Sequence, residues 1–227
     1  MKLKLPKPYI SSSQITTWHY SKGQYVDRYI FGIPTVESPE LLFGKRVSEL
    51  LEKGKWGRES KIVKQVLDRL IRYSKPEHEL KATLSTPKGD VDVLGYIDSY
   101  SPLGTNVRIK KPRIMEYKTG AKLWDKKRAD EHFQTQLYAG IIYKQTGILP
   151  EVKIQWVQTH RVAGISVPTG VVRTFRVVVT VSSVLAALKE AQRVAMEISD
   201  WYAEYLDGAK TAPDPNGPDL PVPDWML

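Results

Sequence analysis

Residues 114–120 read Ile-Met-Glu-Tyr-Lys-Thr-Gly, and this stretch decides how the rest of the chain is interpreted. It opens with two apolar residues, as a buried strand does, yet a carboxylate and an ammonium group follow two residues apart. Because strand side chains alternate between faces, Glu116 and Lys118 share one face with Ile114. Burying either charge alone is costly, so the pair requires a structural partner or a chemical purpose. The most common explanation for an arbitrary Glu-x-Lys pattern is a solvated ion pair.

The charge of the chain favours a polyanionic partner. Its 227 residues carry a formal net charge of +9, and its pI is about 9.5. Lysine and arginine side chains that neutralise phosphates release counterions, which provides affinity for nucleic acid of any sequence. Basic residues also gather around the charged stretch: Arg108, Lys110, Lys111, Arg113, Lys118, Lys122, Lys126, Lys127 and Arg128. The alternative is a solvated basic surface.

Composition narrows the class of protein and of metal site. With 41% hydrophobic residues the chain can bury a sizeable core, so we expect one domain over residues 1–210 and a proline-rich tail over 211–227. We expect no membrane span and no secretory signal, and hence a cytoplasmic protein of a prokaryotic cell or a phage-infected host. The absence of cysteine excludes disulfides, thiolate zinc sites and iron–sulfur clusters. Any metal must be held by oxygen or histidine.

Helix signals occupy the first third of the chain. A serine ahead of an apolar pattern caps a helix, and proline is favoured at the first helical position. These signals predict helices that begin near Ser12 or Ser13, at Pro39 after Ser38, and over about 58–73. Residues 23–36 are rich in Gly, Tyr and Pro and are expected to be irregular.

Strand signals dominate the middle of the chain. Segments 78–86 and 90–100 flank a hairpin turn at Pro87-Lys88-Gly89, and segment 113–119 follows a loop, so three strands form a meander. The remaining expected elements are a helix over 126–146, strands at 152–162 and 171–181, and a long helix capped by Ser182 or Ser183. This order predicts an α/β fold, in which helices flank a central mixed sheet.

A second carboxylate ends the strand that precedes the charged stretch. If the two strands form a symmetric hairpin centred near Val107, Asp98 lies opposite Glu116, and both carboxylates converge with Lys118. Mg²⁺ takes oxygen ligands and is often held by one or two carboxylates together with water and phosphate. The lysine could orient an attacking water and neutralise charge that develops on a phosphate.

Three short motifs occur in order on these elements. They are Gly95-Tyr96-Ile97-Asp98 at a strand end, Glu116-Tyr117-Lys118-Thr119-Gly120 on the next strand, and Gln134-Thr135-Gln136-Leu137-Tyr138 on the following helix. In order and spacing they resemble the GxxD, (D/E)xK and QxxxY motifs of the PD-(D/E)XK nuclease superfamily, in particular its RecB-type exonuclease branch. The resemblance covers roughly residues 10–205 and implies a restriction-endonuclease-like αβββαβ core.

The resemblance also implies roles for individual residues. Asp98 and Glu116 would bind Mg²⁺ or Mn²⁺, with the Tyr117 carbonyl as a further ligand, and Lys118 would be the catalytic lysine. Gln134 would position the lysine or the DNA end, and Tyr138 would support the site or contact a phosphate. Four basic residues next to the site would contact DNA: Lys122, Lys126, Lys127 and Arg128.

The implied activity is that of a metal-dependent deoxyribonuclease, an exonuclease that acts on DNA ends or single strands in recombination, replication or repair. A helicase or recombinase could be its partner. One position departs from the pattern, because Ser48 stands where many RecB-type members have a metal-binding histidine. The adjacent Glu49 could take over that role, or it could be an ordinary exposed helix residue. This departure also leaves open a catalytically inert protein that binds nucleic acid or supports an assembly.

Overall fold

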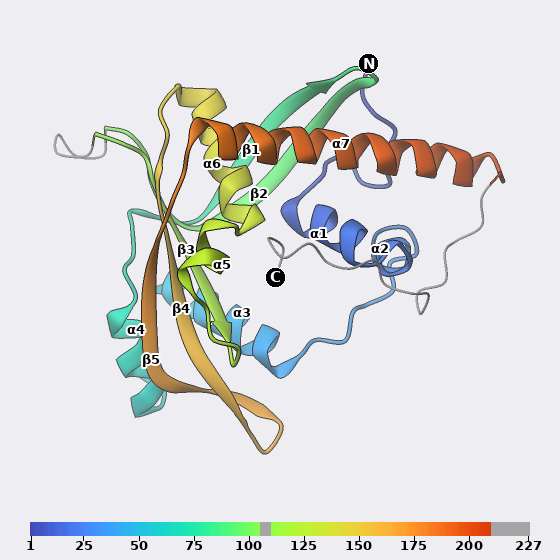
Figure 1. The fold of residues 1–227 in the computed structure, drawn as a ribbon. Helices are drawn as coiled ribbons and strands as arrows, with labels where there is room; N and C mark the ends of the chain where they lie inside the picture. The colour runs from blue at the N-terminus through green and yellow to red at the C-terminus, as the bar shows by residue number, and fades with distance from the viewer. Residues whose placement is uncertain (105–109, 210–227) are drawn as a thin grey trace.

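A five-stranded sheet in the order β1-β2-β3-β4-β5 lies at the centre of the protein (Figure 1). The computed structural model describes residues 1–104 and 110–209, so Val107, Arg108 and the expected tail at 211–227 lie outside the described residues. Strands β3 and β4 are parallel, and the other neighbouring strands are antiparallel. The sheet is therefore mixed, as predicted. The strands are β1 (Lys75–Thr86), β2 (Gly89–Ser101), β3 (Arg113–Gly120), β4 (Glu151–Val162) and β5 (Ile165–Val177).

The helices precede, interrupt and follow the strands in the predicted αβββαβ order. They are α1 (Ser12–Tyr20), α2 (Lys22–Tyr29), α3 (Pro39–Lys53), α4 (Lys61–Arg69), α5 (Lys126–Asp130), α6 (Phe133–Thr146) and α7 (Val181–Leu206). Serine caps and a proline at the first position start α3 as expected, since the Ser38 side chain accepts a hydrogen bond from the Leu41 amide.

Several expected boundaries were wrong. Helix α2 lies in the segment expected to be irregular, because Ser21 caps it and Tyr25 and Val26 are buried. Strand β5 begins and ends earlier than expected, because Ala163 and Gly164 both adopt positive φ and close a tight hairpin with β4. Thr180 caps α7 in place of Ser182 or Ser183.

Two further helices differ from their predicted extents. The helix expected over 58–73 is shorter, because the Ser60 side chain caps α4 at its start and Leu70 is already extended. The helix expected over 126–146 is divided into α5 and α6, because His132 between them has an extended backbone. Both differences depend on the conformation of single residues at helix ends, which hydrophobic periodicity does not define.

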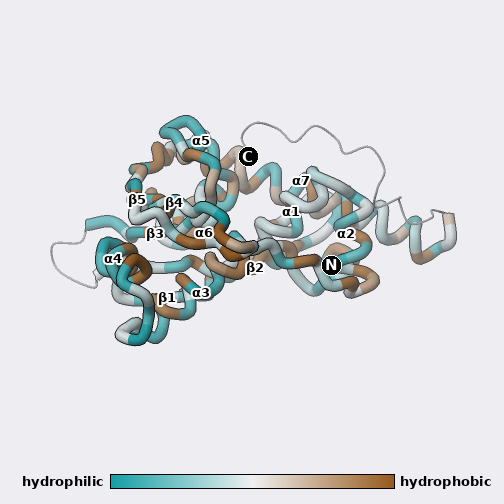
Figure 2. Tube along the Cα trace, turned by 90° about the horizontal axis from the view of Figure 1, so that it is seen from below, coloured by the Kyte–Doolittle hydropathy of each residue, from teal (hydrophilic) through white to brown (hydrophobic). Residues whose placement is uncertain are grey.

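Helices cover both faces of the sheet and form two hydrophobic cores. One core contains residues of α1, α2, α6 and α7 together with Ile114, and the other contains residues of α3 and α4 together with Met115 and Tyr117. The alternation along β3 thus sends neighbouring side chains to opposite cores. Helix α4 is amphipathic: hydrophobic and hydrophilic residues follow each other along one short helix (Figure 2).

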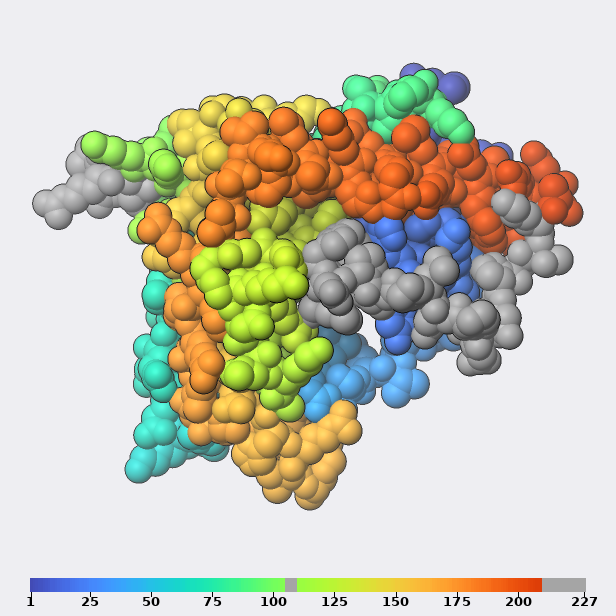
Figure 3. All heavy atoms as spheres, viewed as in Figure 1, coloured from blue at the N-terminus to red at the C-terminus, as the bar shows by residue number. Residues whose placement is uncertain are grey.

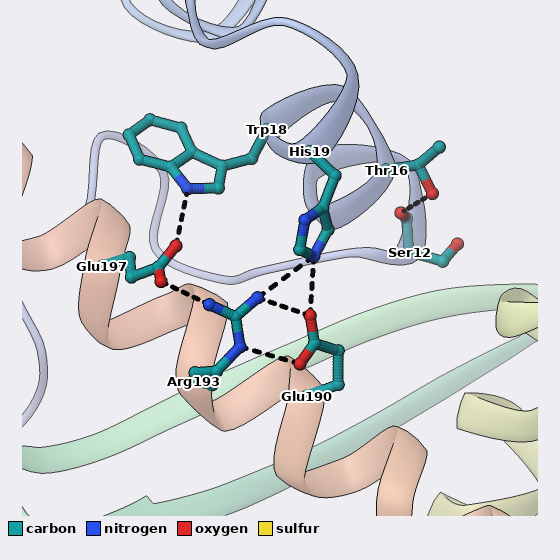
Figure 4. Close-up of polar contacts among 7 residues, drawn as sticks. All are labelled: Ser12, Thr16, Trp18, His19, Glu190, Arg193 and Glu197. Carbon is teal, nitrogen blue, oxygen red and sulfur yellow. Dashed lines mark hydrogen bonds and ion pairs between the residues drawn. The ribbon is translucent and has the colours of Figure 1, made fainter. Parts of the chain in front are cut away.

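Helix α7 forms a continuous ridge on one side of the molecule, with α1 and α2 below it (Figure 3). A group of polar residues, here called the α1–α7 cluster, joins α1 to this ridge (Figure 4). His19 and Arg193 both contact Glu190, at 2.7 Å and 2.6 Å, and the Trp18 indole donates to Glu197 at 3.2 Å. Arg193 also pairs with Glu197, so both carboxylates of the cluster are bonded to cations. Within the described part of the chain, no helix is both long enough and apolar enough to cross a membrane.

Candidate active site

The three motifs meet at a notch in the sheet between β2 and β3. The described pairing of these strands runs from Ser101 opposite Arg113 to Ser99 opposite Met115 and ends there. The next positions in this register are Asp98 and Glu116, as a hairpin centred near Val107 predicts. The Tyr117 amide, released from the β2–β3 ladder, donates to Asp98 Oδ2 at 2.6 Å. A carboxylate therefore takes the place of the next backbone acceptor at the notch.

Glu116 and Lys118 form an ion pair on the face of the sheet that α6 covers. Lys118 Nζ lies 2.9 Å from Glu116 Oε1 and 2.8 Å from Gln134 Oε1, which belongs to α6. The side chain of Glu116 is 2% exposed. Its other oxygen, Oε2, is buried and has no hydrogen-bond partner among the described residues. A buried carboxylate oxygen without a partner is costly, and a bound cation or water would satisfy it.

Tyr138 and Gly95 hold α6 against β2 next to this pair. The Tyr138 hydroxyl accepts a hydrogen bond from the Tyr96 amide at 3.3 Å and another from Gln134 Nε2 at 3.3 Å. A Cβ atom at Gly95 would lie 2.3 Å from Tyr138 Cε1, so only glycine allows this ring to lie so close to the strand. Helix α6, which carries the QxxxY motif, thus directly contacts β2, which carries the GxxD motif. Gln134 bonds to both Tyr138 and Lys118 and so links this contact to the lysine.

Burial and nearby charges shift the pKa values of Asp98, Lys118 and His132 at the notch. Burial raises the pKa of Asp98 well above its ordinary value, and repulsion by Glu116 raises it further. Burial alone would lower the pKa of Lys118, but Glu116 and Asp98 outweigh this effect and raise it. Burial and the positive charge of Lys118 lower the pKa of His132 well below its ordinary value, which keeps this imidazole neutral. The site therefore holds more carboxyl groups than its single lysine can offset, so full ionisation is unfavourable without a further cation.

Two acidic residues that the sequence analysis did not identify lie at the same place. Pro76 pairs with Ser99 and His78 with Ile97, so Glu77 occupies the position opposite Asp98. Glu77 has a φ of 43°, which is unusual for a residue other than glycine. Burial raises the pKa of Glu77, and the charges of Glu52 and Glu116 raise it further. Strand β1 begins three residues before the expected strand and so includes Glu77. Counting back from the hairpin turn at Pro87 and Lys88 would have placed Glu77 opposite Asp98.

A cavity of about 900 Å³, here called the site cavity, opens at the notch. Its walls include Asp98, Glu116, Lys118, Glu77 and Tyr96 from the sheet, and Gly44, Ser48, Glu49 and Glu52 from α3. Helix α3 approaches β3 closely at Gly44, where a Cβ atom would lie 3.0 Å from Thr119 Oγ1. Glu49 is 65% exposed, and its carboxylate lies 3.5 Å from Lys53 Nζ. A metal-binding role of Glu49 stays a prediction. The charge of the neighbouring Glu52 raises the pKa of Glu77.

The donor set at the notch suits a hard divalent cation. Across residues 1–104 and 110–209, no group of three or more His, Asp or Glu side chains is arranged to hold a metal ion. Mg²⁺ is commonly held by one or two carboxylates and completes its shell with water, so Asp98 and Glu116 are sufficient in number. The unpartnered Oε2 of Glu116 is an available ligand atom. Mg²⁺ or Mn²⁺ binding and the part of the Tyr117 carbonyl in it stay predictions.

The predicted DNA-binding residues lie beyond the end of β3, at the start of α5. Lys122 and Lys127 are exposed, whereas Lys126 pairs with Asp130. The guanidinium of Arg128 lies 4.6 Å from the centre of the Trp124 ring, and its Nε and Nη1 atoms have no hydrogen-bond partner in the described structure. These residues supply positive charge beside the site, and their contact with DNA stays a prediction.

Comparisons with known proteins support the fold. No protein-family model matches the sequence, and no curated protein matches it either. The fold is similar to that of a crystal structure described as a "Putative exonuclease" from Eubacterium rectale, with a TM-score of 0.56 and 14% sequence identity over 92% of this chain and 90% of that chain. The crystal structure of SSO0001 has a TM-score of 0.46 and 10% identity over 83% of this chain and 77% of that chain, which is too distant for any argument. At such low identities the comparison indicates a shared fold alone.

Proposed function

We propose that this protein is a metal-dependent deoxyribonuclease of the PD-(D/E)XK type, closest in design to the RecB-type exonucleases. The observation that carries the proposal is the buried Oε2 of Glu116, which has no hydrogen-bond partner among the described residues, while Oε1 of the same carboxylate is bonded to Lys118. Asp98 is the neighbouring carboxylate. Such an oxygen is costly in a purely structural ion pair, whereas a bound cation would satisfy it. The similarity to the fold of a protein described as a "Putative exonuclease" supports the same class of activity.

Each residue of the site would have a distinct task. A divalent cation held by Asp98 and Glu116 would supply Lewis-acid stabilisation of charge on the phosphate. Lys118 would orient the attacking water and offset negative charge as it develops, which is the usual use of a preorganised cation. Gln134 fixes the position of the lysine, and the Tyr117 amide fixes the carboxylate of Asp98.

The proposed substrate is DNA, at ends or in single strands, in recombination, replication or repair in the cytoplasm. The net charge of +9 and the basic residues of the β3–α5 segment favour a phosphate backbone as the ligand. A helicase or recombinase that generates such strands is the kind of partner that we propose for this activity.

One observation favours a second candidate, a catalytically inert protein that binds nucleic acid or supports an assembly. Ser48 faces the site cavity where RecB-type relatives often carry a metal-binding histidine. Serine is a poor ligand for a divalent cation, and loss of one ligand could abolish catalysis while the fold persists.

Cleavage of end-labelled DNA with and without Mg²⁺ separates the two candidates. We expect Mg²⁺-dependent degradation by the parent and loss of that degradation in Lys118→Ala. Lys153→Ala is the matched control, because Lys153 also belongs to a strand and pairs with a glutamate two residues away, at 3.1 Å. Metal-independent binding of DNA without cleavage would support the inert protein. Equal cleavage by the parent and Lys118→Ala would contradict the proposed nuclease.

A further inference from the structure

Asp98 lies in the walls of two cavities. The second, here called the rear cavity, has a volume of about 450 Å³ and shares Glu52, Asp98 and Tyr117 with the site cavity. Both reach the notch where the pairing of β2 with β3 ends. A chain bound along both cavities would therefore pass Asp98, which lies in the wall of each.

The site cavity carries an aromatic ring in a fixed position. Tyr96 is 48% exposed, although its backbone belongs to a central strand. Its hydroxyl donates to Glu79 Oε2 at 3.1 Å, and Glu79 is held in turn by Lys81 at 2.7 Å. Its amide is bonded to Tyr138, which is buried. A ring held at both ends with an open face suits stacking against a nucleic acid base, which is tolerant of sequence.

The rear cavity carries a guanidinium in a fixed position. Arg72 lies 4.7 Å from the centre of the Trp56 ring, and the Trp56 indole donates to Asp68 at 2.9 Å. Within the described chain, no carboxylate forms an ion pair with Arg72, so its N–H groups are available to a ligand. A stacked guanidinium keeps its edge free for bidentate bonding, and phosphate is the anion that fits this edge.

We propose that a single DNA strand passes through both cavities, with a base stacked on Tyr96 on one side of the scissile phosphate and a backbone phosphate bound by Arg72 on the other side. This inference rests on the proposed nuclease function, since it places the scissile phosphate at Asp98. Tyr96 and Arg72 line different cavities, and only the residues around Asp98 are common to both. The two contacts must therefore map to opposite sides of the cleaved bond.

The phosphate contact can be located with single-stranded oligonucleotides of about twelve nucleotides, which is within the usual site size of such grooves. Each oligonucleotide has one phosphate replaced by an uncharged methylphosphonate, and the cut position and single-turnover rate are measured with the parent and Arg72→Ala. We expect the variant to be slower by about tenfold on unmodified DNA. At one position the modification should remove this difference. Arg58→Ala is the control, because Arg58 is exposed but lines neither cavity.

The base contact is located in the same way with one abasic nucleotide in each oligonucleotide. Tyr96→Leu should slow cleavage by about tenfold, and the abasic nucleotide should remove the difference at one position. Tyr20→Leu, an exposed tyrosine of α1 that lines neither cavity, should behave like the parent.

Coupled positions on opposite sides of the cut support the path. Coupled positions on the same side, or none at all with cleavage intact, would overturn the path and leave the nuclease function standing. If no DNA is cleaved, the same oligonucleotides are compared by metal-free binding measured as fluorescence anisotropy. Couplings at two separate positions would then support the path while the nuclease function fails, and their absence would overturn both.

Discussion

Neighbouring parallel strands of this protein carry the same short pattern in two different environments. Glu116 and Lys118 in β3 form an ion pair of 2.9 Å, and Glu151 and Lys153 in β4 form one of 3.1 Å. The side chains of the second pair are 29% and 28% exposed, so water solvates both charges. Glu116 is 2% exposed, and one of its oxygens lacks a partner in the described structure.

The difference comes from the residues beside each pair. Arg113 pairs with Glu151 across the β3–β4 ladder, so a second cation lies near that carboxylate. Glu116 instead has Asp98 beside it, and burial together with the charge of Glu116 raises the pKa of Asp98. A Glu-x-Lys pattern is thus a surface ion pair where its neighbours balance the charge, and a candidate metal site where they do not.

Removing the negative charge from each of the two ion pairs should affect DNA cleavage very differently. Glu116→Gln should slow Mg²⁺-dependent DNA cleavage by about a thousandfold, because it removes the negative charge that would hold the proposed cation. Glu151→Gln should leave the rate within about twofold of the parent, since it alters a solvated pair. Initial rates on end-labelled single-stranded DNA measure both variants. Similar rates for the two variants would mean that the environments do not differ in function.

A smaller effect concerns the contact that supports the first pair alone. Gly95→Ala should lower the free energy of unfolding by about 2 kcal/mol, because the new methyl group collides with the buried Tyr138 ring. Gly120→Ala is the control, since the nearest atom to its Cβ would be 4.0 Å away. Urea denaturation followed by tryptophan fluorescence measures both. Equal stability of Gly95→Ala and the parent would show that the ring can move away without cost.

In the α1–α7 cluster, both carboxylates have cationic partners, and we expect a smaller, pH-dependent effect on stability there. Hydrogen bonds from Arg193 lower the pKa of Glu190 to about 2, from an ordinary 4.5. A lowered folded-state pKa gives stability that is present above pH 4.5 and is lost as the pH falls toward 2. Glu190→Gln should therefore cost about 1 kcal/mol at pH 7 and less at pH 3. Asp200→Asn, which alters an exposed pair with Lys88, should change stability less at both pH values. Equal losses at pH 7 and pH 3 for Glu190→Gln would contradict this assignment.

The parts of the site that could be predicted follow from local rules. Alternation along a strand places Glu116 and Lys118 on one face, and hairpin symmetry places Asp98 opposite Glu116. These rules need only the strand pattern and a turn. The mixed sheet and its order of elements follow from the same signals, and the structure confirms both.

The parts that were missed depend on contacts between distant segments. Glu77 belongs to β1 because that strand extends along β2, although Lys75 and Pro76 before it do not favour a strand locally. Glu52 lines the site cavity with Glu77 and Asp98, because α3 packs against β3 at Gly44. The end of β2–β3 pairing at Ser99 has no signal in the sequence, yet it creates the notch in which the site lies.

The proposal that Asp98 binds a divalent cation can be tested by thermal unfolding of the parent and Asp98→Asn, each with and without Mg²⁺, at pH 7. Because the raised pKa of Asp98 means that its ionised form destabilises the metal-free fold, stability falls as the pH rises above the ordinary value of 3.8. We expect Asp98→Asn to unfold at a higher temperature than the parent without metal, and Mg²⁺ to stabilise the parent but not the variant. If the metal-free variant is less stable than the metal-free parent, or if Mg²⁺ stabilises both equally, Asp98 is not a ligand of the cation.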